Sequence, residues 1–233
     1  MPTILTIPKW IAHNGVVTQI IGESGASSYD IGGIVGYVPN GDNSVYNNQV
    51  SAVITGGYQI GGVVGRIPNT SESSGSYRQK FYYNTVANCV IKGQSNTGYV
   101  GGVVGRISKP LKYNFIYRNL VSVTISTPKS DYVGYIIGGS NYSYNVTNKV
   151  TNEDGTTTNV TTTITYNEKK GDNYLYKVES GTVTSRADNI YLFENSTLNN
   201  VSYKSAAASG NTINVKNIEP FKIQISVNSL SLY

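Results

Sequence analysis

Three times the chain reads almost the same six residues: Ile31-Gly32-Gly33-Ile34-Val35-Gly36, Ile60-Gly61-Gly62-Val63-Val64-Gly65 and Val100-Gly101-Gly102-Val103-Val104-Gly105. A weaker copy follows at Val133-Gly134-Tyr135-Ile136-Ile137-Gly138. Self-similarity at intervals of about 30 to 40 residues is typical of repeat architectures, in which each unit buries its apolar face against its neighbours. The glycine pair indicates a corner where a Cβ atom would clash or where φ must be positive. The nine glycines of the first three copies are therefore predicted to be structural.

A second repeated block of nine residues lies upstream of each glycine copy. The four blocks run from His13 to Ile21, Tyr46 to Ile54, Tyr83 to Ile91 and Tyr117 to Ile125. Each opens on an aromatic ring and ends in two β-branched residues, which favour strands. One repeat is thus predicted to be a strand, a loop, a glycine corner and a second strand. Like strands would stack about 4.8 Å apart in a short β-solenoid, with the four opening rings in one ladder.

The composition supports an all-β fold. Only 13% of the residues are charged, whereas the chain holds 25 Gly and 20 Tyr. Long amphipathic helices need Ala, Leu, Glu and Lys, which are sparse here, whereas Val, Ile, Thr and Tyr favour strands.

The repeated glycine phrase resembles the GLUG motif, named for its Gly-Gly-Leu-Val-Gly core. Ile34, Val63 and Val103 stand where that core has Leu. The resemblance covers about residues 13–139. GLUG repeats occur in large microbial surface proteins, including adhesin-like chains and the non-catalytic parts of IgA-cleaving metallopeptidases. The resemblance implies a β-solenoid stalk or binding surface and supplies no catalytic residue.

After Gly139 the pattern changes to a period of two. Tyr142, Tyr144 and Val146 alternate with polar residues up to Asp154-Gly155, and the alternation returns after this turn. Asp-Gly between two alternating runs is a strong hairpin signal. We therefore expect three parts: a lead-in, cap or exchanged strand over residues 1–12, a four-repeat solenoid over 13–139, and an antiparallel β region over 140–233.

The positive charge lies in the middle of the chain. Residues 66–129 hold nine Lys and Arg side chains against Glu72 alone, a net charge of +8. Such a segment can dock on acidic glycans or on another subunit, or merely keep an exposed face soluble. The partner surface predicted here comprises Arg66, Arg106, Lys109, Lys112, Tyr37 and Tyr99. No nucleic-acid-binding motif is recognisable.

The sequence predicts no catalytic, metal-binding or cofactor-binding residue. Stacking the repeats sets Asp30, Gln59, Tyr99 and Tyr132 in one column and Tyr37, Arg66 and Arg106 in another, without two acids side by side. A polysaccharide-degrading β-helix enzyme, which needs clustered acids, is therefore disfavoured. His13 is the only histidine and Cys89 the only cysteine, so neither can join a cluster of its own kind. A buried, inert thiol is expected for Cys89.

No apolar run approaches the length of a membrane-spanning helix, and no signal peptide is visible. We expect an extracellular or cell-surface protein, or alternatively a virion component.

The leading functional hypothesis is a non-enzymatic subunit of a surface assembly or filament, or a segment of an adhesive stalk. It would be a homo-oligomer joined by β-strand augmentation. The strands proposed for exchange carry Ile4 and Ile7 at one end of the chain and Phe221, Ile223, Ile225 and Val227 at the other. The alternative is an adhesin module that binds glycans or a host surface.

Overall fold

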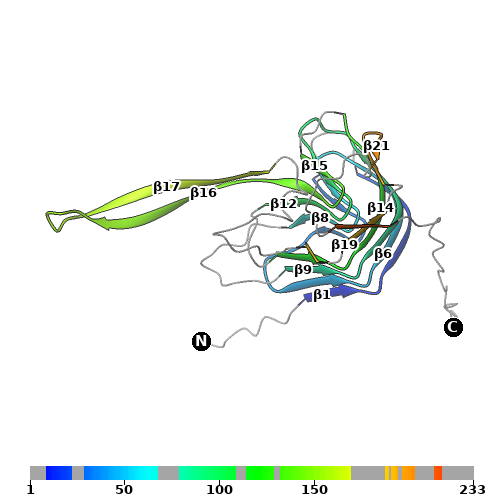
Figure 1. Ribbon diagram of the computed structural model, residues 1–233, viewed down its shortest axis with the longest axis horizontal. Coiled ribbons are helices and arrows are strands. Elements are labelled where there is room, and N and C mark those ends of the chain that lie inside the picture. The colour runs from blue at the N-terminus through cyan, green and yellow to red at the C-terminus, as the bar shows by residue number, and fades with distance from the viewer. Residues whose placement is uncertain are drawn as a thin grey trace.

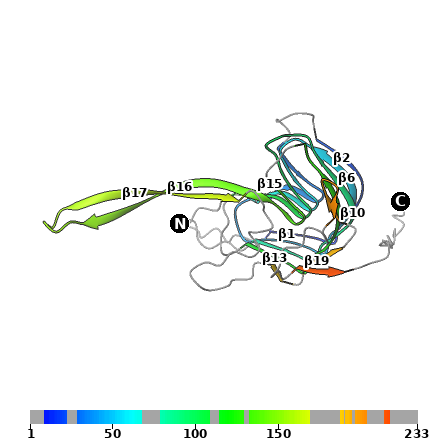
Figure 2. The same ribbon diagram turned by 45° about the horizontal axis from the view of Figure 1, so that its top comes forward.

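The computed structural model describes residues 9–22, 29–67, 79–108, 114–128, 132–168, 187–188, 190–193, 196–202 and 213–216. In these ranges the chain forms strands and no helix, which confirms the all-β prediction (Figure 1). The strands stack into a body, and one long hairpin projects from it (Figures 1 and 2).

The body consists of four sheets, and each repeat contributes one strand to each of them. The first sheet has the order β1 (Lys9–Ala12), β5 (Asn43–Tyr46), β9 (Gln79–Tyr82), β13 (Asn114–Tyr117) and β18 (Ala187–Asp188). The second runs β2 (Gly15–Ile21), β6 (Gln49–Gly56), β10 (Thr85–Gly93), β14 (Leu120–Ser126), β19 (Ile190–Phe193) and β22 (Ile213–Lys216). In addition, β20 (Thr197–Leu198) pairs with β14, and β21 (Val201–Ser202) pairs with β20.

The other two sheets contain the glycine phrase. The third has the order β15 (Tyr132–Gly134), β11 (Tyr99–Gly101), β7 (Gln59–Gly61) and β3 (Asp30–Gly32). The fourth runs β17 (Thr157–Glu168), β16 (Ile137–Thr151), β12 (Val104–Ile107), β8 (Val64–Ile67) and β4 (Val35–Tyr37). Strands from successive repeats are parallel in all four sheets.

The glycine copies align in register, as predicted. Gly32, Gly61, Gly101 and Gly134 pair across the third sheet. Arg66 lies between Tyr37 and Arg106 in the fourth sheet. Both columns expected from the sequence are therefore present.

The alignment of the upstream blocks was wrong by one residue at two of their starts. Tyr46 pairs with Ala12 on one side and with Tyr82 on the other, so His13 and Tyr83 lie one residue past the ladder. For Tyr83 the cause is a bulge in β10 between Val86 and Cys89, which adds a residue to that repeat. The first block is shifted by one residue over its whole length, since Ile20 and not Ile21 pairs with Ile54. The block ends Ile54, Ile91 and Ile125 align as predicted, because they follow the bulge.

A column of asparagines links the first two sheets. Asn48, Asn84 and Asn119 are fully buried. The side-chain oxygen of Asn84 accepts the backbone N–H of Asn48 at 3.2 Å and its Nδ2–H at 2.9 Å, and Asn119 does the same for Asn84. The Nδ2 of Asn84 also donates to the Val45 carbonyl, at 3.0 Å. Each repeat is thus hydrogen-bonded to the next through side chains as well as sheet ladders.

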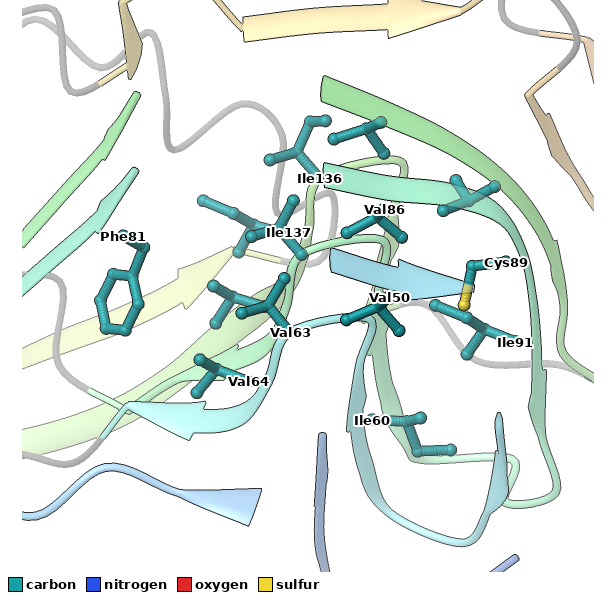
Figure 3. Close-up of a cluster of buried hydrophobic side chains, with 14 of the residues drawn as sticks. Val50, Ile60, Val63, Val64, Phe81, Val86, Cys89, Ile91, Ile136 and Ile137 are labelled. Atoms are coloured by element: carbon teal, nitrogen blue, oxygen red, sulfur yellow. The ribbon is translucent and has the colours of Figure 1, made fainter. Parts of the chain in front are cut away.

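The interior is a continuous column of Val and Ile. Figure 3 shows Val50, Val63, Val86 and Ile137, all fully or almost fully buried, in one cluster with Cys89. The Cys89 thiol donates to the Ala52 carbonyl at 3.1 Å, and burial raises its pKa to about 11. The expectation of a buried thiol is confirmed.

The second glycine of each pair touches the backbone of the following repeat. A Cβ atom on Gly33, Gly62 or Gly102 would lie 2.2, 2.0 and 2.0 Å, respectively, from the carbonyl oxygen of the equivalent residue one repeat later. Those equivalents are Gly62, Gly102 and Tyr135. Only the last repeat carries a side chain at this position, because no described repeat follows it.

The region after Gly139 differs partly from its prediction. The hairpin is confirmed: β16 and β17 pair antiparallel from Ser140↔Glu168 to Thr151↔Thr157 around the predicted turn. However, β18, β19 and β22 pair in parallel with strands of the same stack rather than antiparallel. These strands are short and lack the glycine phrase, so their continuation of the parallel sheets could not be predicted from the sequence pattern. The strands predicted for exchange, residues 3–7 and 221–233, lie outside the described residues.

We expect Gly62→Ala to lower the free energy of unfolding by at least about 3 kcal/mol, because two backbones must separate to admit the methyl group. Gly15→Ala is the matched control, since nothing lies within 4 Å of its Cβ position, and it should change stability by no more than about 0.5 kcal/mol. Urea unfolding followed by circular dichroism measures both. Equal effects of the two substitutions would contradict the packing described here.

Candidate functional surfaces

The structure brings four of the predicted partner residues together. Arg66 on β8 lies between Tyr37 on β4 and Arg106 on β12. The Arg66 guanidinium carbon is 5.5 Å from the centroid of the Tyr37 ring, and that of Arg106 is 4.7 Å from the Tyr99 ring. We call Tyr37, Arg66, Tyr99 and Arg106 the Arg–Tyr cluster. Cation–π contacts of this kind hold a guanidinium in place over a ring.

A hydrogen bond from Arg66 holds the Arg–Tyr cluster to the neighbouring repeat. Arg66 Nε donates to the Ser108 hydroxyl at 2.9 Å. Arg66 and Arg106 are both half-buried. Their aliphatic stems therefore lie against the sheet, while part of each side chain reaches the surface. Lys109 and Lys112, which the sequence adds to this surface, lie outside the described residues.

Two unpaired acceptors stand beside this cluster. Asp30 and Gln59 are neighbours in the third sheet, next to Tyr99. Asp30 Oδ1 and Gln59 Oε1 are buried without a hydrogen-bond partner. Burial raises the pKa of the Asp30 carboxyl above its ordinary value of 3.8, and the positive charges of Arg66 and Arg106 oppose this shift without cancelling it. Sequence analysis placed Asp30 in the correct column but did not foresee the effect of the two arginines across the corner.

Tyrosine rings form two ladders along the stack. Tyr82 lies between Tyr46 and Tyr117 with centroids 5.0 Å away on each side and nearly parallel ring planes. His13 meets Tyr46 edge-on at 5.9 Å instead of stacking. The second ladder runs through Tyr29, Tyr58, Tyr99 and Tyr132. The rings contact one another in stacked, tilted or edge-on arrangements, which are the arrangements of aromatic packing.

A surface that sequence analysis did not locate lies at the start of the stack. All four sheets end on a strand of the first repeat, namely β1, β2, β3 or β4. We call this face of the stack the first-repeat end. Ile11 on β1 is 36% exposed, whereas its neighbour in the sheet, Val45, is 1% exposed. Ile20 on β2 packs against the core but is only half-buried, whereas its neighbour Ile54 is fully buried. The apolar interior therefore continues to an end that no strand of the described residues covers.

The described residues include no group of three or more His, Cys, Asp or Glu that could bind a metal ion. They also include no helix long and apolar enough to cross a membrane. Comparisons of the chain with protein-family models, curated protein sequences and solved structures gave no significant match. The resemblance to GLUG repeats thus rests on the repeated residues alone and stays a prediction.

The raised pKa of Asp30 predicts a pH-dependent effect on stability. The folded chain holds this proton to a higher pH than the unfolded chain, so the free energy of unfolding falls as the pH rises from about 3.8 through the folded pKa. We expect Asp30→Asn to raise the urea midpoint at pH 7 and to leave it nearly unchanged at pH 3.

Asp154→Ala is a control that should change the urea midpoint at pH 7 in the opposite direction, that is, lower it. The reason is that hydrogen bonds from Thr156 lower the pKa of Asp154. Its carboxylate stabilises the fold at pH 7, and this contribution is lost as the pH falls through the folded pKa. A lower urea midpoint for Asp30→Asn at pH 7 would mean that Arg66 and Arg106 outweigh burial.

Proposed function

We propose that the chain is a non-enzymatic structural subunit of a surface assembly or filament, joined to its neighbours by β-strand addition at the first-repeat end. In this proposal the four parallel sheets are the wall of a short β-solenoid, as in the GLUG repeats that the sequence resembles. The setting would be extracellular, at a cell surface or in a virion. The exposed end of the stack is the observation that carries the proposal.

Four edge strands at one end are an unusual liability. An unpaired edge presents backbone N–H and C=O groups that recruit a strand from another chain. Proteins usually protect such edges with charged residues, prolines or a covering segment. The sequence of β2, Gly15-Val16-Val17-Thr18-Gln19-Ile20-Ile21, contains neither a charge nor a proline. It is also the longest of the four edge strands, with seven residues.

The direction of the β2 backbone groups follows from two hydrogen bonds. Gly22 N–H donates to the Thr55 carbonyl, and the Asn14 carbonyl accepts the Gln49 N–H, so both even-numbered residues bond toward β6. Alternate residues of a parallel strand bond to the same neighbour. The odd-numbered residues from Gly15 to Ile21 therefore direct their N–H and C=O groups to the side away from β6, where a further strand can pair.

We expect Gln19→Pro to abolish self-association while leaving the fold intact. Proline removes the N–H of residue 19, which faces away from β6, and no bond within the stack. Gln19→Thr is the matched control, since it keeps the N–H and suits a strand. Light scattering coupled to size exclusion at rising concentration gives the mass, and circular dichroism checks the fold. A wild-type chain that stays monomeric at high concentration would refute the proposal.

A second candidate, a glycan-binding module, is favoured by the Arg–Tyr cluster. Tyrosine faces stack on sugars, and guanidinium groups pair with sulfate or carboxylate groups. Arg66 and Arg106 are adjacent in their sheet, so they offer two positive charges to one polyanion.

For this candidate, Arg66→Ala with Arg106→Ala should lower the affinity for an acidic polysaccharide such as heparin at least about tenfold, because guanidinium–anion pairs are strong hydrogen bonds. The matched control is Lys80→Ala with Lys92→Ala, which removes the same charge from two other described strands. Calorimetric titration measures both. Equal losses would indicate non-specific attraction by net charge, and no binding by the wild type would reject the candidate.

A further inference from the structure

Exposed apolar side chains of the described residues gather at two places. Among the described residues, seven large hydrophobic side chains are exposed. Four of them belong to the first repeat: Ile11, Ile21, Tyr29 and Tyr37. Two more, Val150 and Val160, lie on the projecting hairpin and are each 45% exposed. The seventh is Tyr83, which lies between β9 and β10.

The hairpin carries its apolar residues on one face. We call residues 140–168 of β16 and β17 the arm; it extends well clear of the body in both views (Figures 1 and 2). The register pairs Asn148 with Val160 and Val150 with Thr158, which places both valines on the same face. All side chains from Thr147 to Thr163 are exposed. A two-stranded hairpin alone in water is only marginally stable. Residues 147–163 of the arm therefore lack the packing partner that a sheet normally has on one face.

The last-repeat end of the stack cannot provide that cover for a neighbouring copy. At each contact between repeats, a glycine Cα lies against the carbonyl of the next repeat. In an end-to-end stack of two copies, Tyr135 of one would meet Gly33 of the other at this contact. Because a single Cβ atom there would lie 2.0–2.2 Å from a carbonyl oxygen, Tyr135 prevents coaxial stacking. Apart from the first repeat, the arm is where exposed apolar side chains of the described residues gather.

We propose that the arm of one copy adds to edge strand β2 at the first-repeat end of a second copy. This inference rests on the proposed function and names the element that supplies the added strand. The outer edge of β17 over residues 157–162 pairs with the backbone groups of the odd-numbered residues of β2. The valine face of the arm then covers the apolar end, including the half-buried Val16 and Ile20.

The contact is heterologous, since it joins two different surfaces of the same chain. A copy bound through its arm still offers its own first-repeat end, and its partner still offers an arm. Such contacts build open fibres unless the rotation between copies closes a ring. The arm projects from the body, which lets it reach a neighbour without bringing the two stacks into contact (Figure 1).

The first test changes the arm alone. Val150→Lys with Val160→Lys places two charges on its apolar face and should abolish self-association at every concentration at which the wild type assembles. Thr147→Lys with Thr161→Lys is the matched control, because these residues pair with each other on the opposite, polar face and are also exposed. The control adds the same charge and should still assemble.

The decisive test mixes two variants that are each defective. Gln19→Pro keeps a normal arm, and the Val150→Lys, Val160→Lys variant keeps a normal β2 edge. Each should be monomeric alone, whereas an equimolar mixture should form a one-to-one dimer of 50.4 kDa, twice the 25.2 kDa of one chain. Light scattering after size exclusion gives these masses. Isotope labelling of one variant confirms that the dimer is mixed.

The outcomes separate this inference from the proposed function. If the arm variant assembles like the wild type while Gln19→Pro does not, a different segment adds to β2; the inference fails and the proposed function stands. If the mixture stays monomeric although each variant is folded and defective alone, arm and edge do not meet, and the inference fails. If the wild type never assembles, both fail.

Discussion

The contact between a glycine Cα and the carbonyl of the next repeat sets the geometry of this protein. It recurs at Gly33, Gly62 and Gly102, and it leaves no room for a side chain. Because the corner can close only where glycine stands, the repeats stack in a single register. That register then aligns everything else: the Val and Ile interior, the Asn48–Asn84–Asn119 column and the Arg–Tyr cluster.

The same constraint gives the stack two unlike ends. Tyr135 occupies the glycine position in the last repeat and closes the stack at that corner to a further repeat of the same kind. The first repeat ends in four edge strands, and its core positions are partly exposed. A hairpin with exposed valines projects from the body. The proposed assembly pairs these two uncovered surfaces, so it follows from how the stack begins and ends rather than from any chemically reactive site.

Much of this architecture could be predicted from the sequence, because the glycine phrase marks each corner and Asp154-Gly155 marks the hairpin turn. The bulge in β10 could not be, since one extra residue within a strand leaves no composition signal. The parallel pairing of β18, β19 and β22 was missed because short strands take their direction from tertiary contacts. The effect of Arg66 and Arg106 on Asp30 also depends on how the corner folds in space. The exposed first-repeat end could not be located from the sequence, because only the strand order of the folded sheets shows which strands lack a neighbour.

Hydrogen–deuterium exchange of the unmodified chain at two concentrations can detect strand addition at both proposed surfaces at once. Strand addition gives the outward N–H groups of β2 and β17 new partners, which slows their exchange. The account predicts that raising the protein concentration increases protection in peptides covering residues 15–22 and 157–168, with β7 and β11 unchanged inside the stack. Protection that is independent of concentration in both regions, or that rises only at Tyr132–Gly138, would contradict it.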